Sequence, residues 1–288
     1  MPTIPSEGAP APDSEARPES EARPERETHQ YRQMAESFGG DAERYDRTRP
    51  RYPDALVKRI LTDLRGPAVL DVGIGTGVAA RPFRAAGCRV LGVEVDPRMA
   101  QFARKEGFEV EVSAFEAWNP AGRTFDAVIA GQAWHWVDPA AGATKAAEVL
   151  RSGGRLAVFW NVFQPPAALA EAFAATYRRV LPDWPLFAGT TSGLATYGRQ
   201  LTRASDGIEA TGGFGVPEQW SFDWQRSYSR DEWLDFVPTW GGHSLFPPGP
   251  LDALLAGLGD AIDAVGGRFT VEFTAVVVTA VRAAALCA

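Results

Sequence analysis

The stretch Ala-Val-Leu-Asp-Val-Gly-Ile-Gly-Thr-Gly, residues Ala68–Gly77, decides the fold. Its first five residues are apolar except for Asp71 near the carboxyl end, which predicts a short, buried parallel strand over Ala68–Val72. A helix is predicted over Val78–Ala86, so the glycine-rich turn lies at a helix N-terminus, where anionic groups are favoured. In open α/β sheets, ligands bind outside the carboxyl ends of the strands, which is where this turn lies. The stretch therefore predicts a nucleotide-type cofactor site.

The spacing of the glycines narrows the kind of cofactor. Gly73, Gly75 and Gly77 leave the turn without Cβ atoms, so a ligand can approach the backbone closely. A dinucleotide fingerprint requires Gly-x-Gly-x-x-Gly, with Gly or Ala in the last place. Val78 occupies that place. The pattern is therefore Gly-x-Gly-x-Gly, which disfavours a dinucleotide-dependent oxidoreductase.

An acid stands at the end of the next predicted strand. That strand, Arg89–Val95, carries Glu94, 17 residues after Gly77. A carboxylate about this far beyond the glycines can accept hydrogen bonds from both hydroxyls of a ribose. Asp96 and the proline after it begin a further helix. Asp96 is therefore a second candidate for contact with the cofactor.

The composition sets expectations about partners and location. The chain has 288 residues, of which 45% are hydrophobic, so it can bury a sizeable core. Its net charge of −7 disfavours a nucleic-acid partner, which usually requires a basic face. Cys88 and Cys287 lack metal-ligand spacing, and the reduced cytoplasm is the expected location. No apolar run reaches membrane-spanning length, so no membrane contact is expected. The oligomeric state stays open.

The rest of the chain is divided by its patterns. Residues 1–28 are rich in Pro, Glu and Arg and contain a tandem hexapeptide, which predicts a disordered tail. Residues 29–288 are expected to form one domain, with 161–215 as a lid or substrate-binding insertion. Further helices are predicted over 54–64, 97–106, 140–150, 166–180, 230–236 and 251–265, and further strands over 108–112, 124–130, 155–160, 219–228 and 269–280.

Aromatic residues and arginines are concentrated just before the first strand. Tyr45, Arg49 and Tyr52 lie in this segment, where they could face a cofactor's amino-acid end or a substrate. A surface helix with packed aromatics and salt bridges fits the same pattern. Both interpretations stay open at this point.

The loop after the fourth predicted strand contains Trp134, His135 and Trp136. Loops at this edge of an α/β sheet carry function, which favours a role in the site. His135 is the candidate general base, and the two indoles could favour a cationic ligand through their ring faces. Alternatively, the two indoles simply pack under the lid and His135 bonds to the backbone. His243 is a second candidate base.

Together, these motifs resemble the class I S-adenosylmethionine (SAM)-dependent methyltransferases of the small-molecule, methyltransferase-11 type. Within that family the chain is similar to bacterial relatives of trans-aconitate methyltransferase. The resemblance is specific over Asp71–Trp160. It implies an α/β, Rossmann-like seven-stranded sheet of order 3-2-1-4-5-7-6, with the last strand antiparallel, helices on both faces and a lid insertion. It also implies S-adenosyl-L-methionine as the cofactor.

The resemblance implies roles for particular residues. Ala114 stands where family members often place an acid against the adenine, so adenine recognition would fall to backbone groups and to apolar contacts from Phe115 or Trp118. The positions implied to bind the cofactor are Asp71, Gly73, Gly75, Gly77, Glu94, Asp96, Ala114, Phe115 and Gln132. Those implied for the substrate or lid are Tyr45, Arg49, Tyr52, Trp134, Trp136 and His243.

The implied reaction is methyl transfer from SAM to a carboxylate, hydroxyl or amine of a small molecule. A hydroxyl or protonated amine needs a base, whereas a carboxylate needs none. An RNA or protein methyltransferase shares this core, but the acidic charge disfavours it. A SAM-binding protein that does not methylate also remains compatible with the motifs.

Overall fold

The computed structural model describes residues 38–182, 194–243, 246 and 248–284. The predicted tail at 1–28, Cys287 and part of the predicted lid lie outside these residues. Within the described ranges no helix is both long and apolar enough to cross a membrane. The elements, with η for a 3-10 helix, are η2 (Phe38–Asp41), α2 (Ala42–Thr48), α3 (Asp54–Leu61), β1 (Ala68–Val72), α4 (Ala80–Ala85), β2 (Arg89–Glu94), α5 (Pro97–Lys105), β3 (Glu109–Val112), η3 (Phe115–Ala117), β4 (Phe125–Gly131), η4 (Trp134–Trp136), α6 (Pro139–Val149), β5 (Leu150–Gln164), α7 (Ala167–Val180), α8 (Leu194–Ala210), β6 (Glu218–Ser229), α9 (Arg230–Phe236), η6 (Val237–Thr239), α10 (Pro248–Asp263) and β7 (Arg268–Val281).

The strands form one seven-stranded sheet in the order β3-β2-β1-β4-β5-β7-β6. The pairs among β1 to β5 are parallel, and β7 runs antiparallel to both β5 and β6. The central strands β1 and β4 are buried along almost their whole length, as strands covered by helices on both faces should be. The predicted fold class and strand order are confirmed.

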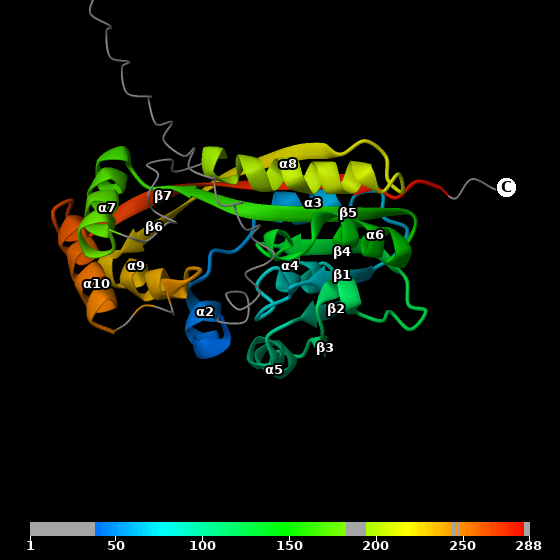
Figure 1. The fold of residues 1–288 in the computed structure, drawn as a ribbon, viewed down its shortest axis with the longest axis horizontal. Coiled ribbons are helices and arrows are strands. Elements are labelled where there is room, and N and C mark those ends of the chain that lie inside the picture. The colour runs from blue at the N-terminus through cyan, green and yellow to red at the C-terminus, as the bar shows by residue number, and fades with distance from the viewer. Residues whose placement is uncertain (1–37, 183–193, 244–245, 247, 285–288) are drawn as a thin grey trace, which may run out of the picture.

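Helices cover both faces of the sheet (Figure 1). On one face, α6 and α8 pack against the main core, which includes Leu70, Val128 and Leu156. On the other face, α3 and α4 pack through residues such as Leu56 and Phe83. Because both faces are dry, the carboxyl ends of the strands are left as the place for polar chemistry.

Helix α8 is the one long element that the sequence pattern does not predict. Its buried Leu201, Ala204 and Ile208 recur at helical spacing and pack on the main core beside α6. The Gly-, Thr- and Ser-rich residues before the helix conceal this periodicity in the sequence. The interpretation of 161–215 as a lid stays a prediction.

Strands β5, β6 and β7 are longer than the others and carry a second core. β5 pairs with β4 as far as Phe159, and its continuation over Trp160–Gln164 pairs with β7 alone. Helices α7, α9 and α10 pack beside this extension at one end of the molecule (Figure 1). We call the buried residues there the outer core: Leu169, Phe173, Tyr177, Tyr228, Trp233, Phe236, Val237, Phe246, Leu254, Leu258, Ile262, Phe269, Val271 and Phe273.

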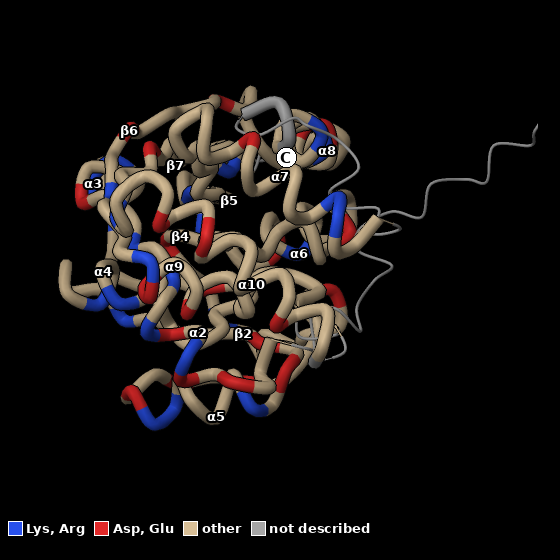
Figure 2. The backbone as a smooth tube through the Cα atoms, turned by 90° about the vertical axis from the view of Figure 1, so that its left-hand side faces the viewer, with Lys and Arg blue, Asp and Glu red and all other residues tan. Residues whose placement is uncertain are grey.

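The short helix α2 connects the outer core to the strand ends. Arg44 and Arg47 both pair with Asp235 of α9, at 2.8 and 2.9 Å. Just before α2, the backbone N–H of Gly39 donates to Asp96 Oδ2 at the start of α5, at 3.0 Å. Figures 1 and 2 both place α2 between α9 and α5, with charged residues of both signs along it.

Candidate active site

The glycine turn after β1 has one open position. A Cβ atom at Gly73 would lie 2.5 Å from the Cβ of Ala133, and one at Gly77 would lie 2.6 Å from the Phe108 ring, so these two glycines permit close packing. A Cβ atom at Gly75 would lie 3.8 Å from the nearest atom outside the turn, the Cε of Met99, and the φ of Gly75 is +57°. Gly75 is therefore where a ligand can approach the backbone, and its φ disfavours a branched side chain.

Glu94, at the end of β2, holds the turn in place. Its Oε2 accepts the backbone N–H of Gly75 at 2.8 Å, and its Oε1 accepts those of Val95 and Asp96 at 2.8 and 2.9 Å. Burial still raises the pKa of this carboxyl, although the three amides act in the opposite direction. The predicted contact with a ribose stays a prediction. The structure adds a second role, which is to fix the position of Gly75.

Asp71 is a buried carboxyl without a partner. The residue is fully buried at the carboxyl end of β1, and neither of its oxygens has a hydrogen-bond partner in the described chain. Its pKa is raised well above the ordinary value, first by burial and then by the charge of Glu94. A carboxylate in this position calls for a cation or a donor from a ligand. SAM carries both a sulfonium and an ammonium, so this side of the turn fits it.

Asp96 has its hydrogen bonds within the protein. It caps α5 through the backbone N–H of Arg98, pairs with the Arg98 guanidinium at 2.8 Å and accepts the N–H of Gly39. These contacts hold the residues before α2 close to the glycine turn. The predicted cofactor contact of Asp96 stays a prediction, because the contacts shown here are structural.

The predicted adenine region follows β3. Ala114 is partly exposed and stands at the N-terminus of η3. Phe115 is only 3% exposed and belongs to the main core, with ring centroids 6.4 Å from Trp118 and 6.2 Å from Trp134. The structure therefore leaves Ala114 and its backbone, rather than the Phe115 ring, as the accessible part of this region.

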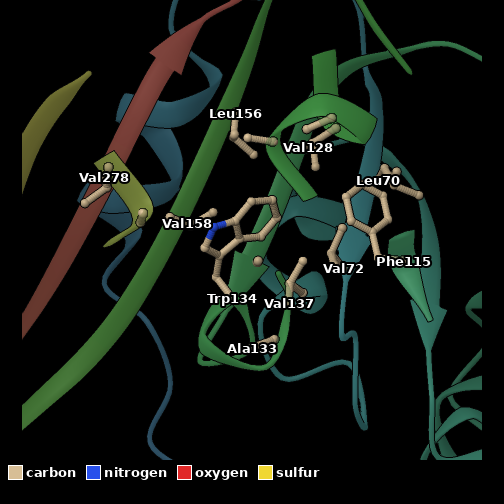
Figure 3. Packing of buried hydrophobic residues seen from close by; sticks show 14 of the residues in the cluster. Leu70, Val72, Phe115, Val128, Ala133, Trp134, Val137, Leu156, Val158 and Val278 are labelled. Carbon is tan, nitrogen blue, oxygen red and sulfur yellow. The ribbon is translucent and has the colours of Figure 1, made fainter. Parts of the chain in front are cut away.

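Trp134 lies in the core and does not present a ring face to a ligand. The residue is 2% exposed, and Figure 3 shows its indole pointing toward Leu156 and Val128. A Cβ atom at Gly142 on α6 would lie only 3.2 Å from the indole, so that glycine makes room for it. The alternative of internal packing therefore describes Trp134, which corrects its expected place beside the cofactor or substrate.

His135 is held by a tryptophan of the neighbouring strand. The Nε1–H of Trp160, which is fully buried on β5, donates to His135 Nδ1 at 3.2 Å. An indole N–H can only donate, so Nδ1 must accept and the proton of the neutral ring is on Nε2. Burial lowers the pKa of His135 to about 4, so the ring is neutral near pH 7. The predicted base role is not supported by this geometry, because Nε2 is a donor.

The predicted N-terminal aromatics lie around this loop. The Trp136 ring is 4.6 Å from the His135 ring and 6.3 Å from the Phe38 ring. The Phe38 ring in turn is 5.8 Å from Tyr45. The structure therefore brings Tyr45 and Trp136 against the same ring, that of Phe38, as part of one aromatic group.

Tyr52 lies nearer the strand ends. Its ring is 4.8 Å from that of Phe159 on β5, and its hydroxyl lies 3.1 Å from the position of a Cβ at Gly131 on β4. Burial raises its pKa well above the ordinary value, and the charge of Asp71 adds to this effect. Tyr52 is thus a neutral phenol beside Phe159 on β5 and Gly131, at the carboxyl end of β4.

Asn161 is a site residue that the sequence interpretation missed. It is buried next to Trp160 on β5, and its side chain bonds to the Arg51 carbonyl at 3.2 Å and to Trp224 Nε1 at 3.3 Å. The backbone carbonyl of Asn161 accepts a hydrogen bond from Gln132 Nε2 at 3.2 Å. Gln132 is therefore fixed beside the strand ends. A polar residue ending an apolar strand was the available signal, the same one that identifies Asp71.

His243 lies away from this loop, within the aromatic packing around the outer core. It is fully buried, and its Nε2 is 2.8 Å from the hydroxyl of Tyr177 on α7. Its ring also contacts Trp240 and Phe246. Burial lowers its pKa to about 4. These contacts are structural, and the predicted role of His243 as a second candidate base or a substrate or lid residue stays a prediction.

Comparisons with known proteins agree with this geometry. The family described as "Methyltransferase domain" matches residues 70–158, from β1 into β5. An uncharacterized methyltransferase of Mycobacterium tuberculosis is 36% identical over 132 residues, which cover 45% of this chain and 54% of that protein. The match thus spans about half of that relative's length.

Two further relatives extend the match. The demethylmenaquinone methyltransferase of Tropheryma whipplei is 32% identical over 163 residues, covering 52% of this chain and 67% of that protein. A solved candidate type II methyltransferase from Anaeromyxobacter dehalogenans shares the fold, with a TM-score of 0.57 and 20% identity over 80% of this chain and 97% of that one. The chain therefore belongs to the SAM-dependent methyltransferase family.

Proposed function

We propose that this protein transfers a methyl group from SAM to a small-molecule acceptor. The observation that carries the proposal is the open turn at Gly75, flanked by two buried acids, Asp71 and Glu94, at the carboxyl ends of β1 and β2. A buried carboxyl without a partner, Asp71, suits a cationic ligand, and the second buried carboxyl, Glu94, suits the hydroxyls of a ribose.

Each part of the site has a distinct task in this proposal. SAM, when bound, supplies an electrophilic methyl group on a positively charged sulfur. Gly75 admits it to the backbone, Asp71 attracts its positive charge and Glu94 receives the ribose. His135 donates its Nε2–H to the methyl acceptor and so orients it. The Nε2 nitrogen carries the proton because Nδ1 accepts the hydrogen bond from Trp160. Positioning and exclusion of water can supply much of the rate of a methyl transfer.

The acceptor class is proposed from the relatives and from charge. The demethylmenaquinone methyltransferase is named for a small-molecule acceptor. The net charge of −7 suits a small molecule better than a nucleic acid. The motif likeness to bacterial relatives of trans-aconitate methyltransferase is part of the proposal, and carboxylate, hydroxyl and amine acceptors are all consistent with it.

Calorimetric titration with SAM, S-adenosylhomocysteine (SAH) and NAD tests the cofactor assignment. SAM and SAH are expected to bind at one site per chain, and NAD is expected not to bind. Release of SAH is then followed with mixtures of small metabolites, and the methylated product is identified by mass spectrometry. Failure of SAM and SAH to bind would refute the proposal. SAM binding without SAH release for any acceptor would favour the non-methylating alternative.

A further inference from the structure

Arg49 differs from the other arginines of its segment. Arg44 and Arg47 share Asp235, whereas Arg49 has no carboxylate within 4.0 Å in the described chain. One of its terminal nitrogens donates to the backbone carbonyl of Thr239 in η6. Its Nε is buried and has no hydrogen-bond partner. Arg49 therefore keeps a positive charge with at least one unused donor.

Aromatic rings surround the guanidinium of Arg49 in the described chain. Its guanidinium carbon lies 4.3 Å from the ring centre of Tyr45, 5.6 Å from that of Phe236 and 5.9 Å from that of Phe38. Four ionisable groups whose pKa the charge of Arg49 lowers are neutral near pH 7, because burial raises the pKa of each tyrosine and lowers that of the histidine. These groups are Tyr52, Tyr197, Tyr228 and His243. A partly buried cation in such surroundings calls for an anion from a ligand.

Two further donors lie beside the same ring. Trp233 is fully buried, and the Nε1–H groups of Trp233 and Trp240 are both buried without an acceptor in the described chain. Their ring centres lie 5.7 and 5.4 Å from that of Phe236, the ring that Arg49 also contacts. Indole N–H groups can only donate. Arg49 Nε and the two indole N–H groups are therefore three donors around Phe236 that have no acceptor in the described chain.

Two carboxylates could use these donors, that of the methionyl part of SAM and that of an acceptor. Arg49 is held against α9 and η6, on the side of the outer core, whereas the buried carboxyls Asp71 and Glu94 lie beside the glycine turn. Phe38 connects Arg49 to Trp136, which lies beside His135. This arrangement favours the acceptor.

We propose that Arg49, together with Trp233 and Trp240, binds a carboxylate of the methyl acceptor. The inference rests on the proposed methyltransferase function and names the substrate class for it. A guanidinium can hold a carboxylate through two parallel hydrogen bonds. The aromatic rings around it suit an apolar body on the same molecule, so the acceptor is a small aromatic or aliphatic carboxylic acid.

The test uses a matched pair of probes on the SAH-saturated protein. Calorimetry compares 3-phenylpropanoate with 3-phenylpropanamide, which differ in the carboxylate alone. The native protein is expected to prefer the acid by at least about tenfold, because hydrogen bonds to charged groups are the stronger ones. Arg49→Met is expected to abolish this preference, and Arg49→Lys to keep part of it. Arg47→Met is the control, since it removes a charge from the same helix but leaves Asp235 paired with Arg44.

The outcomes separate this inference from the proposed function. SAH affinity is expected to be the same in all four proteins, which also shows that each is folded. Equal affinities of the native protein for acid and amide, or a preference for the acid that survives Arg49→Met, would overturn the inference. So would a selective loss of SAH affinity in Arg49→Met, which would assign Arg49 to the cofactor's own carboxylate. Absence of SAH binding by the native protein would instead refute the proposed function.

Discussion

The orientation of the His135 ring makes a prediction that separates a donor from a base. His135→Gln places an amide N–H close to where Nε2–H stands but removes any basic nitrogen. His135→Leu removes both the donor and the base. If Nε2–H donates to the methyl acceptor, His135→Gln is expected to keep the saturated rate within about tenfold of the native rate. His135→Leu is expected to lower it roughly 10- to 100-fold, the effect of losing one hydrogen bond to a charged group or to a developing charge. If His135 were a base, both variants would lose about 10²- to 10⁴-fold.

The pH dependence adds a second readout. The pKa of His135 is lowered to about 4 by burial, so the ring is neutral at every pH above about 6. The saturated rate is therefore expected to show no step from His135 between pH 6 and 9. The measurement is the initial rate of SAH formation at saturating SAM and acceptor, for the native protein and both variants across this range.

Nuclear magnetic resonance can check the ring directly, without any acceptor. The nitrogen shifts of His135 should show a protonated Nε2 and an unprotonated Nδ1, as the bond from Trp160 requires. The reasoning would be refuted by a proton on Nδ1, by titration of the ring near pH 6.5, or by equal rates in His135→Gln and His135→Leu. Trp160→Phe, which removes the donor, is expected to allow both tautomers.

Three further predictions concern the glycine turn and the outer core. Gly75→Val is expected to abolish SAM binding in calorimetry, because valine is strained at φ +57° and its methyls fill the open position; unchanged affinity in a folded variant would exclude this turn as the site. Glu94→Ala is expected to weaken SAM at least about tenfold and Glu94→Gln less, since Gln keeps one acceptor for the Gly75 amide; equal affinities in all three proteins would place the ribose elsewhere. His243 is buried as the neutral ring, so its contribution to stability is fully present above the unfolded pKa of about 6.5 and is lost as the pH falls toward about 4. Between pH 7 and pH 5 the free energy of unfolding should therefore fall by about 2 kcal/mol because of His243, measured by urea unfolding of the native protein against His243→Gln. A parallel pH dependence of the two proteins would contradict this prediction.

Much of the fold could be predicted because strong patterns are local. The apolar run before Asp71 and the glycines after it identify β1 and its turn, and the cap at Ser229 sets the start of α9 in both sequence and structure. Helix α8 could not be read in the same way, because its apolar spacing follows a stretch dominated by small and polar residues.

The site was less predictable, because burial decides the role of a residue and sequence does not show burial. Trp134 and Trp136 are two residues apart, yet one lies in the main core and the other beside Phe38. The partner of His135 is Trp160, 25 residues away on the next strand, and no local pattern relates them. The unpaired charge of Arg49 is visible only once the carboxylates around it are assigned to other arginines.

The continuity of β5 has a consequence for how the protein would select the proposed methyl acceptor. One strand carries Trp160 and Asn161 at the strand ends and Phe163 beside the outer core, and β7 pairs with it from Arg155 to Gln164. A strand paired in this way cannot act as a hinge, since hinges form where backbone dihedrals are free to change. The distance between the glycine turn and the outer core is therefore fixed. For the proposed methyl transfer, we expect the length of the acceptor molecule, rather than a closing domain motion, to decide which acceptors reach the methyl group.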